Sequence, residues 1–337
     1  MEYVKTQYRH PKYINPATDF GFKFIFKDEE ITRGFLNALL QKQNPETNIA
    51  KVKIVDGEAD DTNKETRRVV YDVYCETDSG EEFVIEMQND QQEYFSDRIV
   101  MYLSRAVSRQ QKKGYINFIN AKGEEDRKPW DYHLANIYGV FFMNFKDEKR
   151  PKAFSHCTLS DTEDHEIDSD VIQYWKIQMP FYREMKESDC KTDIDKWIFN
   201  LSNMESMETQ LAFTQEIPLF ARLEKIAEYS ALDEKQQRLY DESFHNYMCY
   251  HGQLDYKYKK GIEFGEEIGF LKGEEKGRAE GRAEGRAEGR AEGIKEGIAE
   301  GERKTNLENA RKMKAANIPL QIIADITKLP LDVIEKL

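Results

Sequence analysis

Apolar residues recur with two different periods in the first part of the chain. Helical spacing through residues 19–43, with Phe20, Phe24 and Leu36 among the apolar positions, predicts a helix that ends before Pro45. Short runs rich in β-branched and aromatic residues predict strands near residues 52–55, 69–75, 83–88 and 137–142. A further helix is expected over residues 93–113. The predicted order of elements is therefore α-β-β-β-α-β.

The later pattern divides the chain into four segments. Residues 1–192 contain the alternating helices and strands and form the first segment. Residues 193–258 carry apolar side chains at helical spacing, such as Trp197, Leu201 and Leu223, and are expected to complete the same core. Residues 259–303 form a repeat with glycine at every fourth position. Residues 304–337 are expected to form a small helical module.

The glycine repeat has an unusual charge pattern. Its central copies read Gly-Arg-Ala-Glu, so like charges recur four residues apart, and each glycine costs a helix about 1 kcal/mol relative to alanine. A glycine stripe lets two helices approach closely, and an arginine stripe on one chain can face a glutamate stripe on another. The repeat therefore predicts a homo-oligomer formed by helices. The alternative is a flexible linker.

The last segment is predicted to consist of short helices broken at Pro319 and Pro330. Its residues 322–334 are similar to a helix-turn-helix fragment. The second of these helices carries the acidic residues Asp332 and Glu335, which favours a small oligomerisation or capping module over one that reads DNA.

Composition narrows the class of protein. The chain has 337 residues, of which 39% are apolar, enough for one substantial core with an appendage. No stretch approaches the ~20 consecutive apolar residues of a membrane helix, and the first residues are polar rather than those of a secretory signal. We therefore expect a cytoplasmic protein without membrane contact. The net charge of −13 argues against a general nucleic-acid coat.

One stretch differs in charge from the chain as a whole, which is acidic. Residues 98–123 contain no acidic side chain. On the predicted helix, positions three and four apart share one face, and this face carries Arg98, Tyr102, Arg105, Arg109 and Lys112. Such a face could follow a DNA backbone. The alternative is an ordinary solvated helix face.

The candidate chemistry lies on the hairpin formed by the two middle strands. Asp72 is on the first strand, a turn is predicted at residues 77–80, and Glu86 and Gln88 are on the second strand. The period of two points Glu86 and Gln88 to one face and Met87 to the other. Asp72 can then meet Glu86 across the hairpin. Two adjacent carboxylates repel each other unless a cation lies between them, and oxygen ligands suit Mg²⁺ or Mn²⁺. The alternative is a set of solvated polar residues on the outer face.

Asp72 followed by Glu86-x-Gln88 resembles the acidic core motif of the PD-(D/E)XK nucleases. The chain is specifically similar to the branch called PD-(D/E)XK nuclease family transposases, or recombination-promoting nucleases (Rpn). The further segments that carry this resemblance, in order, are residues 18–26, Arg98-x3-Tyr102-x8-Gln111-x2-Gly114-Tyr115, residues 137–142, residues 195–197, the glycine repeat and residues 318–337.

The resemblance implies a fold, an activity and a site. The expected fold is an α/β, restriction-endonuclease-like core, a mixed sheet flanked by helices, with a helical C-terminal extension. The implied activity is Mg²⁺-dependent hydrolysis of DNA phosphodiester bonds that promotes recombination, or acts in mobile elements or defence. Asp72, Glu86 and the Met87 carbonyl would hold the metal, and Gln88 would orient the nucleophile. Most enzymes of the superfamily carry lysine where this chain has Gln88, and an amide cannot supply that positive charge.

Three alternatives stay open. Asp19 could form an ion pair with Lys23 within one helix, or, by the resemblance, it could hold a metal-bound water at the mouth of the site. The protein could be a catalytically silent oligomeric scaffold that binds DNA or a protein. It could also be a nuclease that acts on RNA.

Overall fold

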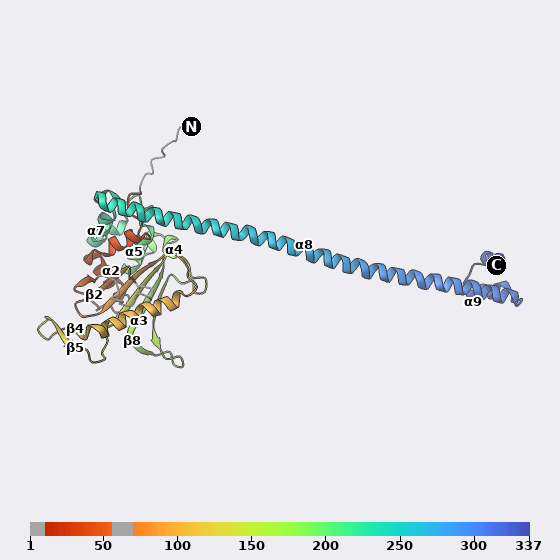
Figure 1. Ribbon diagram of the computed structural model, residues 1–337, viewed down its shortest axis with the longest axis horizontal. Helices are drawn as coiled ribbons and strands as arrows, with labels where there is room; N and C mark the ends of the chain where they lie inside the picture. Colours follow the sequence, from red (N-terminus) through yellow and green to blue (C-terminus); the bar gives the residue numbers. More distant parts are fainter. Residues whose placement is uncertain (1–10, 56–69) are drawn as a thin grey trace, which may run out of the picture. The chain divides into compact units, whose positions relative to one another are not determined.

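The computed structural model of the protein describes residues 11–55 and 70–337 (Figure 1). The chain divides into two compact units, the first ending at Tyr250 and the second beginning at His251. The first unit contains both sheets and the candidate site. The boundaries predicted at residues 192, 258 and 303 stay predictions.

A six-stranded mixed sheet forms the centre of the first unit. Its spatial order is β1-β2-β3-β6-β8-β7, in which β3, β6 and β8 run parallel and the outer pairs are antiparallel. Its strands are β1 Val52–Val55, β2 Val73–Thr77, β3 Glu82–Gln88, β6 Ile137–Met143, β7 Phe154–Ser160 and β8 Ile167–Gln178. The predicted strand over residues 69–75 therefore begins later than expected, and its residue 69 lies outside the described segments.

The sequence pattern missed four strands. A separate two-stranded sheet joins β4 Tyr115–Ile119 to β5 Glu125–Pro129. In the main sheet, β8 and the edge strand β7 form a further antiparallel pair. The strand β5 reads Glu-Asp-Arg-Lys-Pro and has no apolar alternation to reveal it. The predicted order α-β-β-β-α-β is therefore a subset of the observed elements.

The helix predicted over residues 19–43 is two helices, α1 Asp19–Phe26 and α2 Glu29–Gln41. The break has a local cause. Asp28 adopts an extended conformation and caps α2, because its carboxylate accepts hydrogen bonds from the N–H groups of Glu30 and Ile31. The expectation of a continuous helix was wrong at this point.

The larger core lies between one face of the sheet and most of the helices. Phe142 of β6 contacts Phe35 of α2, and Phe35 contacts Trp197. Buried side chains between Ile194 and Phe244 belong to the same core. The elements that follow β8 are α4 Met179–Arg183, η1 Glu187–Asp189, α5 Asp193–Asn203, η2 Met204–Ser206, α6 Ala212–Glu216, α7 Pro218–Ala227 and η3 Tyr229–Ala231.

The helix α3, Phe95–Lys113, covers the opposite face of the sheet (Figure 1). It forms a smaller core in which Leu103 packs with Val84 and Phe141. Gly114 ends the helix with a φ of 69°, a left-handed conformation that glycine adopts without steric cost. This helix was predicted within two residues of its observed bounds.

The helix α8, Glu234–Ala315, runs for 82 residues and includes the whole glycine repeat. The helical prediction for the repeat is confirmed, and the flexible-linker alternative was wrong. Two short helices follow, α9 Leu320–Thr327 and α10 Leu331–Lys336, and the predicted breaks at Pro319 and Pro330 precede them. Ala310, Ile323 and Ile334 form their small core. Across the described segments, no helix combines the length and apolar character needed to cross a membrane.

Candidate active site

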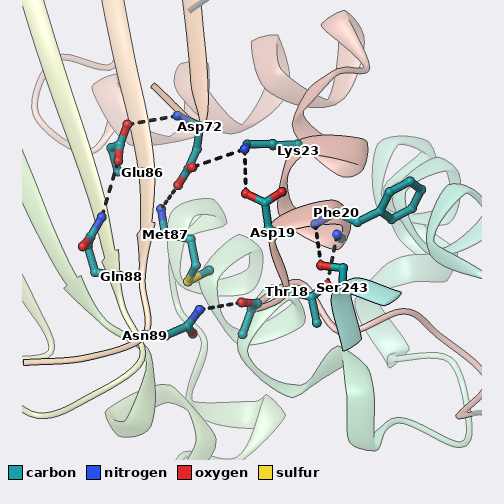
Figure 2. A network of polar contacts seen from close by, with 12 residues as sticks. Thr18, Asp19, Phe20, Lys23, Asp72, Glu86, Met87, Gln88, Asn89 and Ser243 are labelled. Carbon is teal, nitrogen blue, oxygen red and sulfur yellow. Dashed lines mark hydrogen bonds and ion pairs between the residues drawn. The ribbon is translucent and has the colours of Figure 1, made fainter. Parts of the chain in front are cut away.

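The β2–β3 hairpin places two carboxylates opposite each other. Val73 pairs with Ile85, and the same register continued by one residue puts Asp72 opposite Glu86. The Asp72 N–H donates a hydrogen bond to Glu86 Oε1 at 3.0 Å, and the Met87 N–H donates to Asp72 Oδ2 at 2.9 Å (Figure 2). The predicted meeting of the two acids is confirmed.

The predicted division of the β3 side chains between two faces is also confirmed. The Gln88 amide donates to Glu86 Oε2 at 3.4 Å, so both side chains lie on the face that α3 covers. Met87 packs against the larger core on the other face. Glu86 is only 1% exposed and Gln88 is also buried. The alternative of solvated residues on an outer face was therefore wrong.

Burial makes this acid pair electrostatically costly. It raises the pKa of Glu86 well above the usual 4.5, and the neighbouring charge of Asp72 raises it further. Burial also raises the pKa of Asp72. A hard cation would relieve both effects, so the residues fit a divalent metal ion.

The number of protein ligands is small. Within residues 11–55 and 70–337, no group of three or more acidic, histidine or cysteine side chains is arranged to hold a metal ion. The pair itself offers two carboxylates. Mg²⁺ is commonly bound by one or two carboxylates and completes its shell with water and phosphate oxygens.

A cation from α1 lies beside the pair. Lys23 Nζ is 2.6 Å from Asp19 Oδ1 and 3.8 Å from Asp72 Oδ1 (Figure 2). Burial acts to lower the pKa of Lys23, but the Asp19 hydrogen bond and the charges of Asp19, Asp72 and Glu86 outweigh it and raise the pKa. The ion-pair interpretation of Asp19 is confirmed, and its role toward a metal-bound water stays a prediction.

The basic stripe on α3 is only partly open to solvent. Tyr102 is 6% exposed and belongs to the smaller core, and Arg98 donates two hydrogen bonds to its hydroxyl group. The Arg109 guanidinium stacks 4.5 Å from the centre of the Tyr74 ring. Arg105 is half-buried, and Lys112 is exposed. The five residues share one side of α3 as predicted, but they do not form a continuous outer surface.

Arg98 nevertheless acts on the site. Its positive charge lowers the pKa values of Asp72 and Glu86, although burial prevails for both. Lys23 from α1 and Arg98 from α3 therefore place positive charge around the acid pair from two different elements. Contact of the α3 residues with DNA stays a prediction.

A cavity of about 800 Å³ opens beside the acid pair. It lies between α1, the end of β3 and the first turns of α8. Its edge is fixed by Asn89, whose amide donates to the Ala17 carbonyl at 2.7 Å. The lining includes Lys23, Phe24, Lys27, Gln88, Gln92 and Tyr247. The site thus combines buried acids with an opening wide enough for a ligand.

Comparison with known proteins identifies the class. The family model described as "PD-(D/E)XK nuclease family transposase" matches residues 16–256. This is well over half of the chain, so the protein belongs to that family, and the mixed sheet flanked by helices is consistent with the family's α/β fold. The comparisons found no match among curated proteins or solved structures.

Sequence patterns predict neither Lys23 nor Arg98 as a neighbour of the acid pair. They predict Lys23 only as the partner of Asp19, and Arg98 only as part of a DNA-facing stripe. The substitution of Gln88 for lysine was the available signal, because it left a requirement for positive charge that another element had to meet.

Proposed function

We propose that this protein is a Mg²⁺-dependent DNA endonuclease that hydrolyses phosphodiester bonds. The observation that supports this most strongly is the Asp72–Glu86 pair, joined across one hairpin. Its neighbours Lys23 and Gln88 line a cavity. Family membership supports nuclease chemistry. A role in recombination, mobile elements or defence is part of the proposal by resemblance.

Each residue has a proposed role. Asp72, Glu86 and the Met87 carbonyl would bind Mg²⁺ or Mn²⁺, which supplies an activated water and neutralises charge on the phosphate when bound. Gln88, held by its hydrogen bond to Glu86, would orient the attacking water. The Asp72 carboxylate is fixed by the Met87 N–H, which keeps one of its oxygens turned into the site.

The α3 helix would bind the substrate only in part. Lys112 is exposed and could contact a phosphate directly. Arg98, Arg105 and Arg109 would act mainly by shaping the potential of the site, together with the Tyr102 hydroxyl group. Asp19, at the mouth, would hold a water molecule.

A direct assay tests this function. Supercoiled plasmid, linear duplex, single-stranded DNA and RNA are incubated with the full-length protein in Mg²⁺ or EDTA, beside Asp72→Asn. Cleavage of DNA that EDTA and the substitution both abolish supports the proposal. Cleavage of RNA alone identifies an RNA nuclease. No cleavage of any substrate favours the catalytically silent scaffold.

We also propose that α8 joins copies of this chain. A Cβ atom placed on the glycines from Gly261 to Gly301 would meet no atom of the described chain within 4 Å, so the stripe is open. The arginine and glutamate stripes beside it are complementary between two copies. The double variant Gly281→Ala, Gly285→Ala is expected to lower the mass seen in sedimentation, whereas Ala279→Ser with Ala283→Ser leaves it unchanged. A monomeric wild-type protein contradicts this proposal.

A further inference from the structure

We infer that Lys23 is the cationic catalytic residue of this site, and that it supplies from α1 the positive charge that Gln88 cannot supply from β3. This inference rests on the proposed nuclease function. It assigns to a helix a charge that the superfamily pattern places on the strand.

Position is the first argument. The Lys23 side chain extends from α1 toward the hairpin, with its ammonium group between the carboxylates of Asp19 and Asp72 (Figure 2). Lys23 and Gln88 line the same cavity. A phosphate group that reached Asp72 from this cavity would therefore meet the ammonium group on the way.

The second argument concerns the ion pair with Asp19. The Asp19 side chain is 70% exposed and that of Lys23 is 39% exposed. Exposed pairs four residues apart stabilise a helix by only about 0.3–0.5 kcal/mol, so this pair contributes little to folding. Asp19 instead holds the flexible lysine side chain at the mouth of the site, which makes Asp19 a positioning residue.

The third argument excludes the neighbouring cations. The Arg98 guanidinium donates to the Tyr102 hydroxyl group and to Gln92 Oε1, and it lies 5.0 Å from the centre of the Tyr102 ring. These contacts hold it on the α3 side of the acid pair. Lys27, the residue after α1, lines the cavity but is exposed. Lys53 of β1 is also exposed and lies outside the cavity lining, so it is the control.

The chemistry needs a charge and no proton from this residue. In hydrolysis, a water oxygen forms a bond to phosphorus, the bond from phosphorus to the leaving ester oxygen breaks, the attacking water releases one proton to solvent, and the leaving oxygen takes one from solvent. Negative charge increases on the phosphate oxygens meanwhile. Lys23 remains an ammonium ion and stabilises that charge, an effect on the order of 10²–10³-fold in rate for one well-placed donor.

The test compares Lys23→Met with Lys53→Met in the full-length protein. Plasmid cleavage in Mg²⁺ is expected to slow by about 10²–10³-fold in Lys23→Met and by less than about twofold in Lys53→Met. Mn²⁺ binding without DNA, followed by electron paramagnetic resonance, is expected to stay equal or tighten in Lys23→Met, because a competing positive charge is removed. Tighter binding with slower cleavage is the signature of a catalytic cation.

Two further variants test whether Lys23→Met loses activity because its charge is lost or because its structure is disturbed. Lys23→Arg keeps the charge and is expected to retain more activity than Lys23→Met. The double variant Lys23→Met, Gln88→Lys returns an ammonium group to the strand and is expected to recover part of the lost rate.

The contrary outcomes are distinct. Equal cleavage by Lys23→Met and the wild type overturns the inference alone and leaves Lys23 as a counter-ion. Weaker Mn²⁺ binding by Lys23→Met also overturns it, because Lys23 would then only support the shape of the pocket. A wild-type protein that cleaves no nucleic acid removes the proposed function and this inference together.

Discussion

The two ends of the β2–β3 hairpin carry similar residues, but they differ in how closely a lysine approaches the acids and in the space beside them. At one end, Asp72 faces Glu86, with Lys23 nearby. At the other end, Glu76 pairs in register with Glu82, and Lys113 lies between them. At each end of the hairpin, two opposed acids therefore face each other, and one lysine from a helix lies beside them.

At the far end, Lys113 forms ion pairs with both acids. Lys113 Nζ is 2.5 Å from Glu76 Oε1 and 2.8 Å from Glu82 Oε1, and the Tyr74 hydroxyl group donates to Glu82. The adjoining cavity is only about 10 Å³, which is about the space of one water molecule. This network is structural.

At the site end, no lysine of the described chain approaches the two acids as closely as Lys113 does at the far end. The ammonium group of Lys23 stays 3.8 Å from Asp72, and the adjoining cavity is about 800 Å³. The contrast shows that residue types alone do not define a site. A buried acid pair becomes available for a ligand when its partner cation is distant and the space beside it is open.

The largest expected effect is on cleavage. Asp72→Asn and Glu86→Gln are expected to lower the rate of plasmid cleavage by at least about 10²-fold, because each removes a metal-binding oxygen and its charge. Glu82→Gln, the matching change at the far end of β3, is expected to leave the rate within about threefold. If Glu82→Gln lowers the cleavage rate as much as Glu86→Gln does, the two ends of the hairpin do not differ in function as proposed.

The two lysines are expected to differ in stability. Lys113→Met leaves Glu82, whose side chain is 2% exposed, without its cation and is expected to cost about 2–3 kcal/mol. Lys23→Met is expected to cost less than about 0.5 kcal/mol. Urea unfolding followed by tryptophan fluorescence measures both, since all three tryptophans lie before residue 250. Lys112→Met, which changes an exposed neighbour, serves as the control.

The acid pair is expected to destabilise the metal-free protein at neutral pH. The pKa of Glu86 is raised by folding, so the unfolded chain ionises first and stability falls as pH rises through the interval above 4.5. Glu86→Gln removes this cost. Its melting temperature in EDTA is expected to exceed that of the wild type at pH 8, by about 2–4 °C for each 1 kcal/mol. The two proteins converge near pH 4, and a difference that grows on acidification contradicts the argument.

The smallest effect is expected at Tyr74. Tyr74→Phe removes the hydroxyl group that donates to Glu82 and is expected to cost about 1 kcal/mol of unfolding free energy. The ring remains to pack beneath Arg109. Plasmid cleavage is expected to be unchanged, and a slower rate would mean that the two ends of the hairpin are coupled.

Local patterns predicted what local contacts determine. The register that brings Asp72 to Glu86 spans one short hairpin, so alternation and a turn were sufficient to predict it. The helix α3 also followed from its own periodicity. Its orientation did not, because arginines and a tyrosine gather on the sheet side through ring contacts such as Arg109 on Tyr74.

Distant contacts could not be predicted in this way. Lys23 reaches Asp72 from a helix about fifty positions earlier, and no periodicity in either segment encodes that approach. The break at Asp28 depends on one capping side chain, and the strands β7 and β8 on pairing with each other and with β6. These features depend on tertiary packing, which overrides local preference.

Residues that are translated much later than α1 form contacts that stabilise this helix. The Phe20 N–H donates to Ser243 Oγ, and the Phe20 ring contacts that of Tyr240. The hairpin acids are translated long before either residue. A growing chain thus carries its two acids through the synthesis of about 150 further residues without the late contacts that support the Lys23 helix, so complete assembly of the site waits until translation has passed Ser243.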